Sequence, residues 1–404
     1  MLNPRLAELP GNMFVELRAL LADVSPPAGL APIDMGIGEP QGAPPAILTE
    51  TIAAHPDAWG RYPPPLGLDD LRTASAEWLT RRYDLPTGMV QPQRHVLAVA
   101  GTKEALYLVA TIAVGPAKAG QRPAVLMPDP AYFVYVNAAI LSGAETVMLD
   151  CPRDNNFLPD LDTLAQALLD RTALFYLCSP SNPQGSIASP DYLARLITLA
   201  QAHDFVLVLD ETYAEIYDRT APAGGLQVAR DLAARQGTTT DQAMRNVLVS
   251  HSLSKRSSAA GLRAGFVAGD PDLIAAFARV RASTAPVIPV PLAHAAAALW
   301  RDDAHAEANR NAYRARFDAA ERHLSNRAGF YRPPGGFFLW LQVDDGKATA
   351  RRLWREAAIR AMPGAFLSDN RPDGSNPGTG YLRLAIVHSP AVVEEAARRI
   401  APLL

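Results

Sequence analysis

Cysteine is scarce in this chain, and no run of apolar residues is long enough to cross a bilayer. Two cysteines, Cys151 and Cys178, in 404 residues exclude a disulfide framework as the main source of stability. The longest apolar runs have only the length of strands, and the first residues lack the basic start and the cleavage site of a secretory signal. We therefore expect a cytoplasmic protein that binds no membrane.

An excess of positive charge is also absent. The 38 lysines and arginines are balanced by 41 aspartates and glutamates, so the net charge is −3 at pH 7. Because nucleic-acid binding depends on a basic face that neutralises phosphates, we expect no nucleic-acid partner. Lysine in particular is rare, since the chain has only Lys103, Lys118, Lys255 and Lys347. Any chemistry that needs an amine nucleophile is restricted to these four side chains.

The composition that remains is typical of a large globular protein. Hydrophobic residues make up 49% of the sequence and charged residues 20%, and the length suits two or three domains of roughly 150 residues. Between residues 94 and 270, short apolar runs alternate with segments of helical length and periodicity. Such runs suit strands covered on both faces, so we predict an α/β fold with a mostly parallel, seven-stranded sheet. The predicted strands are residues 95–100, 124–128, 146–150, 173–178, 206–210, 246–250 and 265–269.

The rest of the chain predicts a second, smaller α+β domain. Residues 277–320, rich in Ala and Arg, predict one long helix, and the tail from Phe337 predicts strand, helix, strand and helix. The stretch before residue 45, rich in Pro and Gly, predicts an arm that rejoins this smaller domain. The predicted division is therefore an N-terminal arm with part of the small domain (1–45), a large domain (46–285) and a small C-terminal domain (286–404).

The most informative segment surrounds Lys255. This lysine lies just beyond a predicted strand, is preceded by the hydroxyl of Ser252, and is followed eight residues later by Arg263. Burial and neighbouring cations would lower the pKa of the amine and make it nucleophilic toward an aldehyde. The hydroxyls and the arginine suit a phosphate beside it. A surface lysine that follows a strand is the alternative reading of the same segment.

Two more polar groups follow predicted strands. Asp210 ends the run Phe205-Val-Leu-Val-Leu, where a buried carboxylate needs a cation such as a protonated pyridine nitrogen. A helix cap is the alternative role for this aspartate. Tyr213, three residues on, can donate to a phenolate oxygen. Asn182 lies on a turn stiffened by prolines, which by itself indicates only a turn.

Phosphate and ring contacts are predicted at two further junctions. Gly101, Thr102 and Lys103 join a strand to a helix, which suits a phosphate held by backbone N–H groups. Tyr132 follows a strand bounded by proline and can place its ring over a planar ligand. Each signal is ambiguous alone. Because all of them lie at carboxyl ends of strands, where α/β proteins bind ligands, their order favours one common site.

That ordered set of residues resembles the class I/II aminotransferases of fold type I, which depend on pyridoxal 5′-phosphate. The resemblance covers essentially the whole chain and is based on Asn182-Pro, Asp210-x-x-Tyr213, Ser252-x-x-Lys255 and Arg263. It implies a large cofactor-binding domain, a smaller α+β domain, and transamination as the activity. Gln184 departs from the family's commoner threonine in Asn-Pro-Thr-Gly.

The resemblance also implies a role for each cofactor contact. Lys255 matches the lysine that binds the cofactor covalently, and Asp210 matches the carboxylate that keeps the pyridine nitrogen protonated. Tyr213 and Asn182 match the donors to the phenolic oxygen, and Tyr132 matches the aromatic residue stacked on the ring. The residues implied for the phosphate are Gly101, Thr102, Lys103, Ser252, Arg263 and, from a neighbouring subunit, Tyr62.

The role implied for Tyr62 makes a homodimer the expected assembly. Arg383 matches the arginine that binds the α-carboxylate of amino-acid and 2-oxo-acid substrates, a role that suits a guanidinium better than an ammonium. Gly38 matches a glycine turn over the substrate. No metal site is predicted.

Within the family, residues 3–6, 17–23, 252–257 and 265–270 resemble the N-succinyldiaminopimelate aminotransferases of lysine biosynthesis. The implied reaction joins N-succinyl-LL-2,6-diaminopimelate with 2-oxoglutarate or glutamate, and the distal carboxylate of that substrate needs a second cation. Arg279 and Arg281 are the candidates, with a solvated helix face as the alternative reading. Transamination of aspartate, alanine or an aromatic amino acid, and a β-lyase reaction on the same scaffold, remain open.

Overall fold

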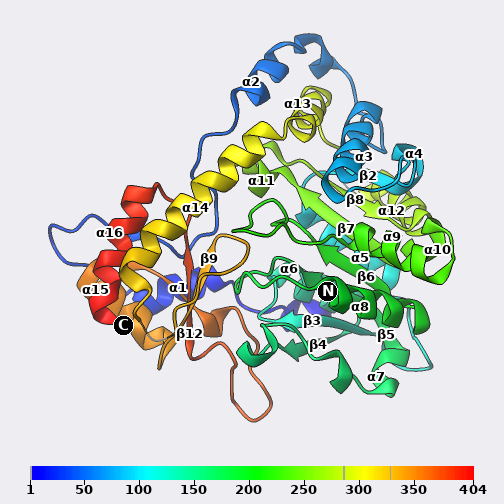
Figure 1. The fold of residues 1–404 in the computed structure, drawn as a ribbon. Coiled ribbons are helices and arrows are strands. Elements are labelled where there is room, and N and C mark those ends of the chain that lie inside the picture. Colours follow the sequence, from blue (N-terminus) through cyan, green and yellow to red (C-terminus); the bar gives the residue numbers. More distant parts are fainter. Residues whose placement is uncertain (1, 285–286, 328) are drawn as a thin grey trace.

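A seven-stranded sheet forms the centre of the larger part of the molecule (Figure 1). The computed structural model describes residues 2–284, 287–327 and 329–404. The strand order is β2-β8-β7-β6-β5-β3-β4; β8 is antiparallel to both neighbours and the other pairs are parallel. All seven predicted strands are confirmed: β2 (Val96–Val99), β3 (Ala124–Asp129), β4 (Glu145–Asp150), β5 (Thr172–Cys178), β6 (Val206–Asp210), β7 (Val247–Ser252) and β8 (Gly265–Gly269).

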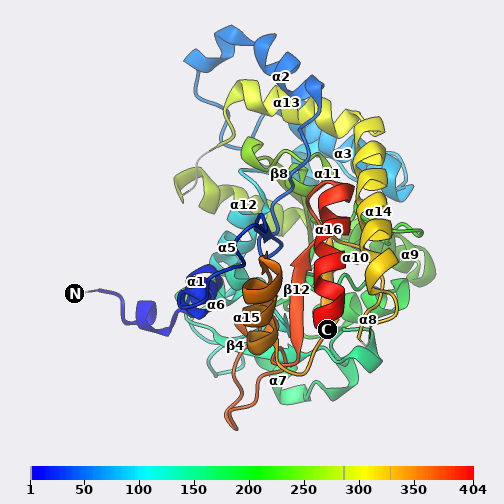
Figure 2. The same ribbon diagram turned by 90° about the vertical axis from the view of Figure 1, so that its left-hand side faces the viewer.

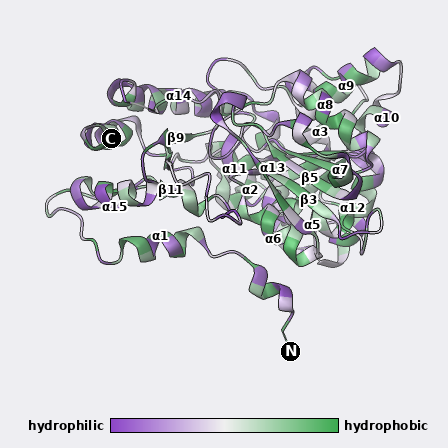
Figure 3. Cartoon of the chain, turned by 90° about the horizontal axis from the view of Figure 1, so that it is seen from below, coloured by the Kyte–Doolittle hydropathy of each residue, from purple (hydrophilic) through white to green (hydrophobic). Residues whose placement is uncertain are grey.

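Helices cover both faces of this sheet because successive strand residues point to opposite sides. In β2, Val96 and Ala98 belong to one hydrophobic cluster, whereas Leu97 and Val99 belong to another. The first cluster includes α3 (Asp69–Tyr83), α8 (Pro190–Ala202) and α9 (Gly225–Gln236), and the second includes α5 (Thr102–Ala113), α6 (Phe133–Ser142) and α12 (Pro271–Thr284). Figure 3 shows the strands as the apolar layer between these helices. The predicted α/β class is therefore confirmed.

A smaller antiparallel sheet lies beside the large one. Its order is β11-β12-β9, formed by β9 (Phe338–Gln342), β11 (Met362–Pro363) and β12 (Tyr381–Ala385). A separate hydrophobic cluster joins β9 and β12 to α14 (Ala304–Leu324), α15 (Gly346–Ala357) and α16 (Pro390–Ile400). The N-terminal strand β1 (Ile33–Asp34) pairs with β10 (Ile359–Arg360), so the arm returns to this part of the fold. Figure 2 shows the first residues extending outward from it.

The single long helix expected over residues 277–320 is wrong. Three helices occupy this region: α12, α13 (Val290–Arg301) and α14. Pro289 and Pro291 bound the start of α13, because proline is tolerated only in the first turn of a helix. Asp302, one residue before the N-cap of α14, accepts from the backbone N–H of Ala304 at 2.9 Å and so holds the turn between α13 and α14. The composition of the region is helical throughout and hides both breaks.

The division into domains remains a proposal, and the boundary expected between residues 285 and 286 lies outside the described residues. The side chains of α13 pack in the cluster of the large sheet, where Trp300 is 1% exposed. We therefore propose that the small domain begins with α14. Within the described part of the chain, no helix is both long and apolar enough to cross a membrane.

Candidate active site

A cavity of about 560 Å³ lies where the carboxyl ends of β3, β5, β6 and β7 face β12 of the small sheet. Its walls come from both sheets and from the arm segment at Gly38, which contacts β9. Glycine is required there, because a Cβ at Gly38 would lie 2.5 Å from the ring of Phe338. The structure brings most of the predicted residues to this cavity: Gly38, Thr102, Lys103, Tyr132, Asn182, Asp210, Tyr213, Ser252, Lys255, Arg263 and Arg383.

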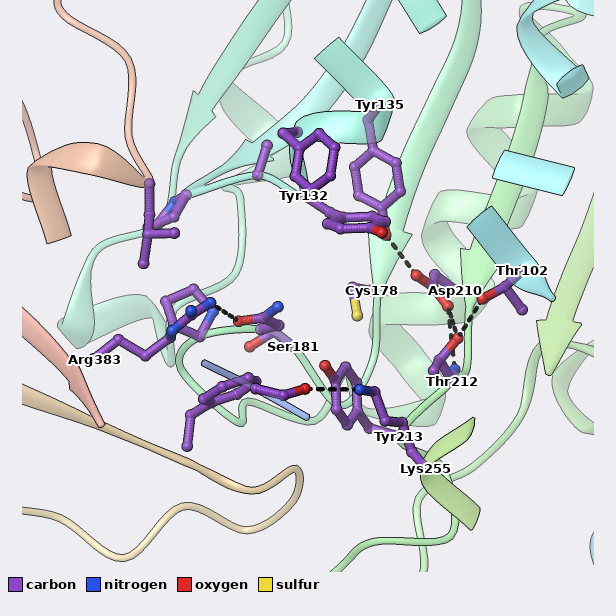
Figure 4. Close-up of a pocket in the computed structure, with 18 of the residues that line it drawn as sticks. Thr102, Tyr132, Tyr135, Cys178, Ser181, Asp210, Thr212, Tyr213, Lys255 and Arg383 are labelled. Carbon is purple, nitrogen blue, oxygen red and sulfur yellow. Dashed lines mark hydrogen bonds between the residues drawn. The ribbon is translucent and has the colours of Figure 1, made fainter. Parts of the chain in front are cut away.

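Asp210 is a buried carboxylate at the end of β6, with 5% of its surface exposed. Its Oδ2 accepts from the hydroxyl of Tyr135 at 2.7 Å, and its Oδ1 accepts from the hydroxyl of Thr212 at 2.5 Å (Figure 4). The hydroxyl of Ser250 also donates to Oδ1, at 3.3 Å. These donors are neutral, so the carboxylate keeps its negative charge available for a cationic ligand in the cavity.

Tyr135 and Thr212 both hold Asp210, although neither was predicted from the sequence. Tyr135 lies three residues after Tyr132, one turn along α6, and the two rings meet edge to face at 5.6 Å between centroids. Thr212 stands two residues after the aspartate, the spacing at which a side chain bonds the backbone of its own turn; its N–H donates to Oδ1 at 3.2 Å. Both spacings are visible in the sequence, but only the fold shows that Tyr135 and Thr212 contact Asp210.

Lys255 lies in the short helix α11 (Leu253–Arg256), directly after β7. Its Nζ donates to the carbonyl oxygen of Gly38 at 2.9 Å and lies 5.1 Å from the centroid of the Phe337 ring. Desolvation lowers the pKa of this amine from 10.5 to about 8.

Four charged groups modify that effect: Glu39 and Asp210 favour the ammonium form of Lys255, whereas Arg383 and Arg263 disfavour it. The net result is an amine that is much easier to deprotonate than an exposed lysine. Lys255 is therefore suited to act as a nucleophile or a base near neutral pH.

The start of α5 forms a cradle for an anion. Gly101 takes a φ of +86° just before the helix, and a Cβ there would lie 2.6 Å from Nη2 of Arg263. Arg263 thus lies against the same turn whose first backbone N–H groups have no partners within the helix. On the other side, the hydroxyl of Ser252 donates to that of Ser254 at 3.0 Å. A guanidinium, a helix N-terminus and two hydroxyls form a donor set that fits a phosphate.

Arg383 presents a buried guanidinium from β12, with 4% of its surface exposed. Its Nη1 donates to Oδ1 of Asn182 at 3.3 Å, and its Nη2 donates to the carbonyl oxygen of Gly36 at 2.9 Å. Its Nε is buried without a hydrogen-bond acceptor among the described residues. Burial lowers the pKa of Arg383 to about 10, which leaves it cationic at neutral pH. A buried cation with an unused donor fits a carboxylate ligand.

Two tyrosines complete the walls of the cavity. Burial, reinforced by the charge of Asp210, raises the pKa of Tyr132 to about 12, so its hydroxyl stays protonated. Burial also raises the pKa of Tyr213, whose ring packs edge to face against Phe337 at 5.3 Å between centroids. Both phenols are therefore neutral hydrogen-bond donors at physiological pH.

Three predicted residues lie apart from the cavity. Tyr62 is fully exposed, beside Trp59, which is 56% exposed. Arg279 is exposed on α12. Arg281 is buried, with 1% of its surface exposed, and its Nε lies 2.6 Å from Oε1 of Glu104. Within a single chain, neither arginine contacts the space where a substrate would bind, so their predicted role in binding remains a prediction.

Comparison with known proteins agrees with this arrangement. A family model described as "Aminotransferase class I and II" matches residues 31–400. The 4-dedimethylamino-4-oxo-anhydrotetracycline transaminase OxyQ of Streptomyces rimosus is 32% identical over 98% of this chain and 99% of its own. LL-diaminopimelate aminotransferase 2 of Nostoc sp. is 28% identical over 98% of this chain and 97% of its own.

Among solved structures, an aminotransferase from Neisseria meningitidis is 35% identical and superposes with a TM-score of 0.92 over the full length of both chains. The match to the family model spans most of the sequence, and the curated relatives share nearly its whole length. The chain therefore belongs to the class I and II aminotransferases, a family of enzymes that depend on pyridoxal phosphate.

Proposed function

We propose that Lys255, Asp210 and Arg383 are the central residues of an active site that transfers an amino group between an amino acid and a 2-oxo acid. The observation that carries the proposal is the meeting of three buried or desolvated charges in one cavity: an amine with a pKa of about 8, a carboxylate and a guanidinium. Shifted pKa values such as those of Lys255 and Arg383 are typical of catalytic sites. Each of the three suits a different part of the reaction.

The donor set of the cavity fits pyridoxal phosphate. The first turn of α5, from Gly101 to Lys103, would hold the phosphate together with Ser252 and Arg263. Ser254 lines the same wall and joins this group. Asp210 would hold the protonated ring nitrogen, because it is the buried carboxylate of the cavity and its own partners are neutral donors.

Other residues of the cavity have proposed roles at the faces and the edge of the cofactor ring. Tyr132 would cover one face of the ring, and Tyr213 and Asn182 would donate to its phenolic oxygen. The hydroxyl of Tyr213 stays protonated because burial raises its pKa, so it can serve as that donor. The bound cofactor supplies an electron sink for the bond that breaks at the substrate α-carbon.

The protein's own part in the reaction is to hold groups and move a proton. Nζ of Lys255 would hold the aldehyde carbon of the cofactor in the resting enzyme. As a free amine, Lys255 would accept the proton of the substrate α-carbon and release it again. Arg383 binds the α-carboxylate, which fixes the α-carbon beside Lys255. Desolvation serves both functions, since it lowers the pKa of the amine and strengthens the ion pair.

For the amino donor we propose N-succinyl-LL-2,6-diaminopimelate, with 2-oxoglutarate as the acceptor. The names of the LL-diaminopimelate aminotransferases among the relatives support a diaminopimelate-type donor. The apolar side chains along the cavity wall suit its aliphatic chain: Met13, Phe14, Phe157, Leu158 and Leu367. A role for Arg279 at the distal carboxylate requires a second subunit, because this residue does not line the cavity of its own chain.

A panel of substrates tests both levels of the proposal. Purified enzyme is assayed with N-succinyldiaminopimelate, aspartate, alanine and phenylalanine, each with 2-oxoglutarate, and Lys255→Ala is the control. The polycyclic ketone named for the S. rimosus relative, which shares 32% identity with this chain, is added as an acceptor. We expect the succinylated donor to give the highest kcat/KM. A higher value with a neutral donor or the polycyclic ketone would reject the substrate assignment, and turnover by Lys255→Ala would reject the assignment of the lysine.

We also propose that the active enzyme is a homodimer. Tyr62 and Trp59 are exposed large aromatic side chains on one segment, and the predicted role of Tyr62 at the phosphate needs a second subunit. Light scattering is expected to give twice the mass of the chain, and Tyr62→Phe is expected to weaken cofactor binding. A fully active monomer would refute this assembly.

A further inference from the structure

The segment that carries Lys255 is fixed by a part of the molecule that has no role in the reaction described above. Residues 255–258 come soon after β7, and each of them forms a hydrogen bond to the junction between α13 and α14 or to the first turns of α14. This junction is more than forty residues further along the chain. It holds both the main chain and the side chains of the segment.

Asn309, on the second turn of α14, makes the contacts to the main chain. Its Nδ2 donates to the carbonyl oxygen of Lys255 at 2.9 Å and to that of Arg256 at 3.1 Å. Its Oδ1 accepts from the hydroxyl of Ser258 at 3.1 Å. One amide side chain therefore uses both its donor and its acceptor groups on the short stretch that begins with the reactive lysine.

The neighbouring side chains are held by the same junction. Arg256, 2% exposed, donates to the carbonyl oxygen of Leu299 at 2.7 Å and pairs with the carboxylate of Asp303 at 2.8 Å. The hydroxyl of Ser257 lies 2.8 Å from Nε2 of His305, whose Nδ1 lies 3.1 Å from Asp302.

The order of Ser257, His305 and Asp302 resembles a hydrolase triad, but Ser257 is 2% exposed and lines none of the described cavities. Without access for a substrate, a nucleophilic role is excluded. The three residues act as a clamp on the turn after Lys255.

The helix that supplies these contacts also packs against the small sheet. The far half of α14, including Phe317 and Leu324, belongs to the hydrophobic cluster of the small sheet, which contains Leu382 and Leu384 on either side of Arg383. Figure 1 shows α14 as a long helix that runs from beside α11 to the small sheet. A single rigid element thus joins the strand of the carboxylate-binding arginine to the turn of the lysine.

We propose that Asn309 is a positioning residue, which fixes the peptide carbonyls at Lys255 and Arg256 and so keeps Nζ between the carbonyl oxygen of Gly38 and the ring of Phe337. The inference rests on the proposed function of Lys255. Without the amide, two buried carbonyl oxygens lose their donor, and the turn after β7 relaxes. The lysine then has more freedom and more contact with water.

The test uses Asn309→Ala and Asn309→Asp, with Asn311→Ala as the matched control. Asn311 lies on the exposed side of the same helix, where its side chain accepts only from Arg314 at 2.9 Å among the contacts of the described residues. Asn309→Asp keeps the oxygen that accepts from Ser258 but loses the amide donor. Melting temperatures are measured for all variants, so that a loss of stability can be separated from a displacement of Lys255.

The main measurement is the pH dependence of acetylation of each lysine by competitive labelling, read by mass spectrometry. The chain has only four lysines, so Lys103, Lys118 and Lys347 serve as internal controls in every sample. The full chain is acetylated once in the presence of pyridoxamine phosphate and once in its absence. Pyridoxamine phosphate is the amine form of the cofactor, so it leaves the amine of Lys255 free. The result therefore does not depend on cofactor binding or turnover.

In both Asn309 variants we expect the labelling midpoint of Lys255 to move upward while those of the other lysines stay unchanged. We expect kcat to fall at least about tenfold with KM within about twofold, because small displacements of a reacting group reduce rates steeply. Asn311→Ala should match the wild type. An unchanged Lys255 midpoint, whether or not the melting temperature falls, would overturn the positioning role. If the wild type shows no transamination, the proposed function fails while the labelling result still decides this inference.

Discussion

Substitution of Arg383 by lysine should separate recognition of the α-carboxylate from every other function of the site. The guanidinium is buried and donates at present to Asn182 and Gly36, with Nε unused among the described residues. Lysine keeps the charge but offers a single nitrogen, so a two-point contact with a carboxylate becomes a one-point contact. The loss of one hydrogen bond to a charged group costs about 1.5–3 kcal/mol, or about a 10- to 150-fold fall in kcat/KM.

The assay compares one amino acid with the amine formed by removing its α-carboxylate. The amino acid and the amine are each mixed with wild type and with Arg383→Lys, and the rate of change in the absorbance of the bound cofactor is measured. The amino acid should lose the full factor, whereas the amine, which has no carboxylate for Arg383 to bind, should change by less than about threefold. Arg360→Lys is the matched control, since Arg360 lies on β10 of the same domain and pairs with Asp34 at 2.9 Å, away from the cavity.

If the rate in Arg383→Lys fell equally with the amino acid and with the amine, the proposed role of Arg383 in binding the α-carboxylate would be refuted. It would mean that Arg383 holds the architecture of the cavity, through Gly36 and Asn182, and not the substrate. A fall confined to KM with an unchanged kcat would also be informative, because it would indicate that the arginine binds ground state and transition state equally.

Three further predictions follow from the geometry. Asp210→Asn should lower kcat at least about a hundredfold, because it removes the charge opposite the ring nitrogen, while the urea midpoint of unfolding changes little; an unchanged kcat would make Asp210 a structural residue. In the cofactor-free chain, the pKa of Lys255 is about 8 in the folded state and near 10.5 in the unfolded state, so the unfolded chain binds more protons between these pH values. The free energy of unfolding should therefore rise with pH across this window. Urea unfolding measured at several pH values should show a steeper rise for wild type than for Lys255→Met. Arg281→Ala should lower the melting temperature by an amount equivalent to about 3 kcal/mol, because the largely buried carboxylate of Glu104 loses its guanidinium partner and keeps the N–H of Ala100 as a donor; normal stability with a raised KM for acidic donors would instead support a substrate role.

The parts of this protein that could be predicted from sequence depend on local pattern. Each strand of the large sheet is a short apolar run ended by a turn residue, so all seven could be located. Asp210 ends such a run, and Lys255 and Asn182 lie in the turns that follow two others. The sheet then brings them to one edge because the ends of parallel strands align. Arg383 needed the resemblance to a family, since nothing in its own strand distinguishes it from an ordinary surface arginine.

The parts that could not be predicted depend on contacts between distant segments. Arg281 follows Arg279 by two residues on one helix, yet only Arg281 turns inward, to a glutamate 177 positions earlier in the chain. The break before α13 was hidden because the alanine-rich composition favours helix on both sides of Pro289. Asn309 could not be predicted either, because an asparagine on a polar helix has no evident role in the sequence. Its role depends on α14 lying beside the turn after β7.

The hydrogen-bond partners of Lys255 and Arg383 explain how both cations remain available for the reaction. Lys255 and Arg383 donate to backbone carbonyls of the same arm segment, those of Gly38 and Gly36. A carbonyl oxygen satisfies a donor without neutralising its charge, whereas a carboxylate at the same distance would stabilise the ammonium form of Lys255 and raise its pKa. It would also compete with the substrate carboxylate for Arg383. Because neutral acceptors hold both side chains, the amine can lose its proton near neutral pH and the guanidinium keeps an uncompensated charge for the substrate. Replacing either carbonyl contact by an acidic side chain in the arm would therefore slow the enzyme even if every residue around the cofactor were unchanged.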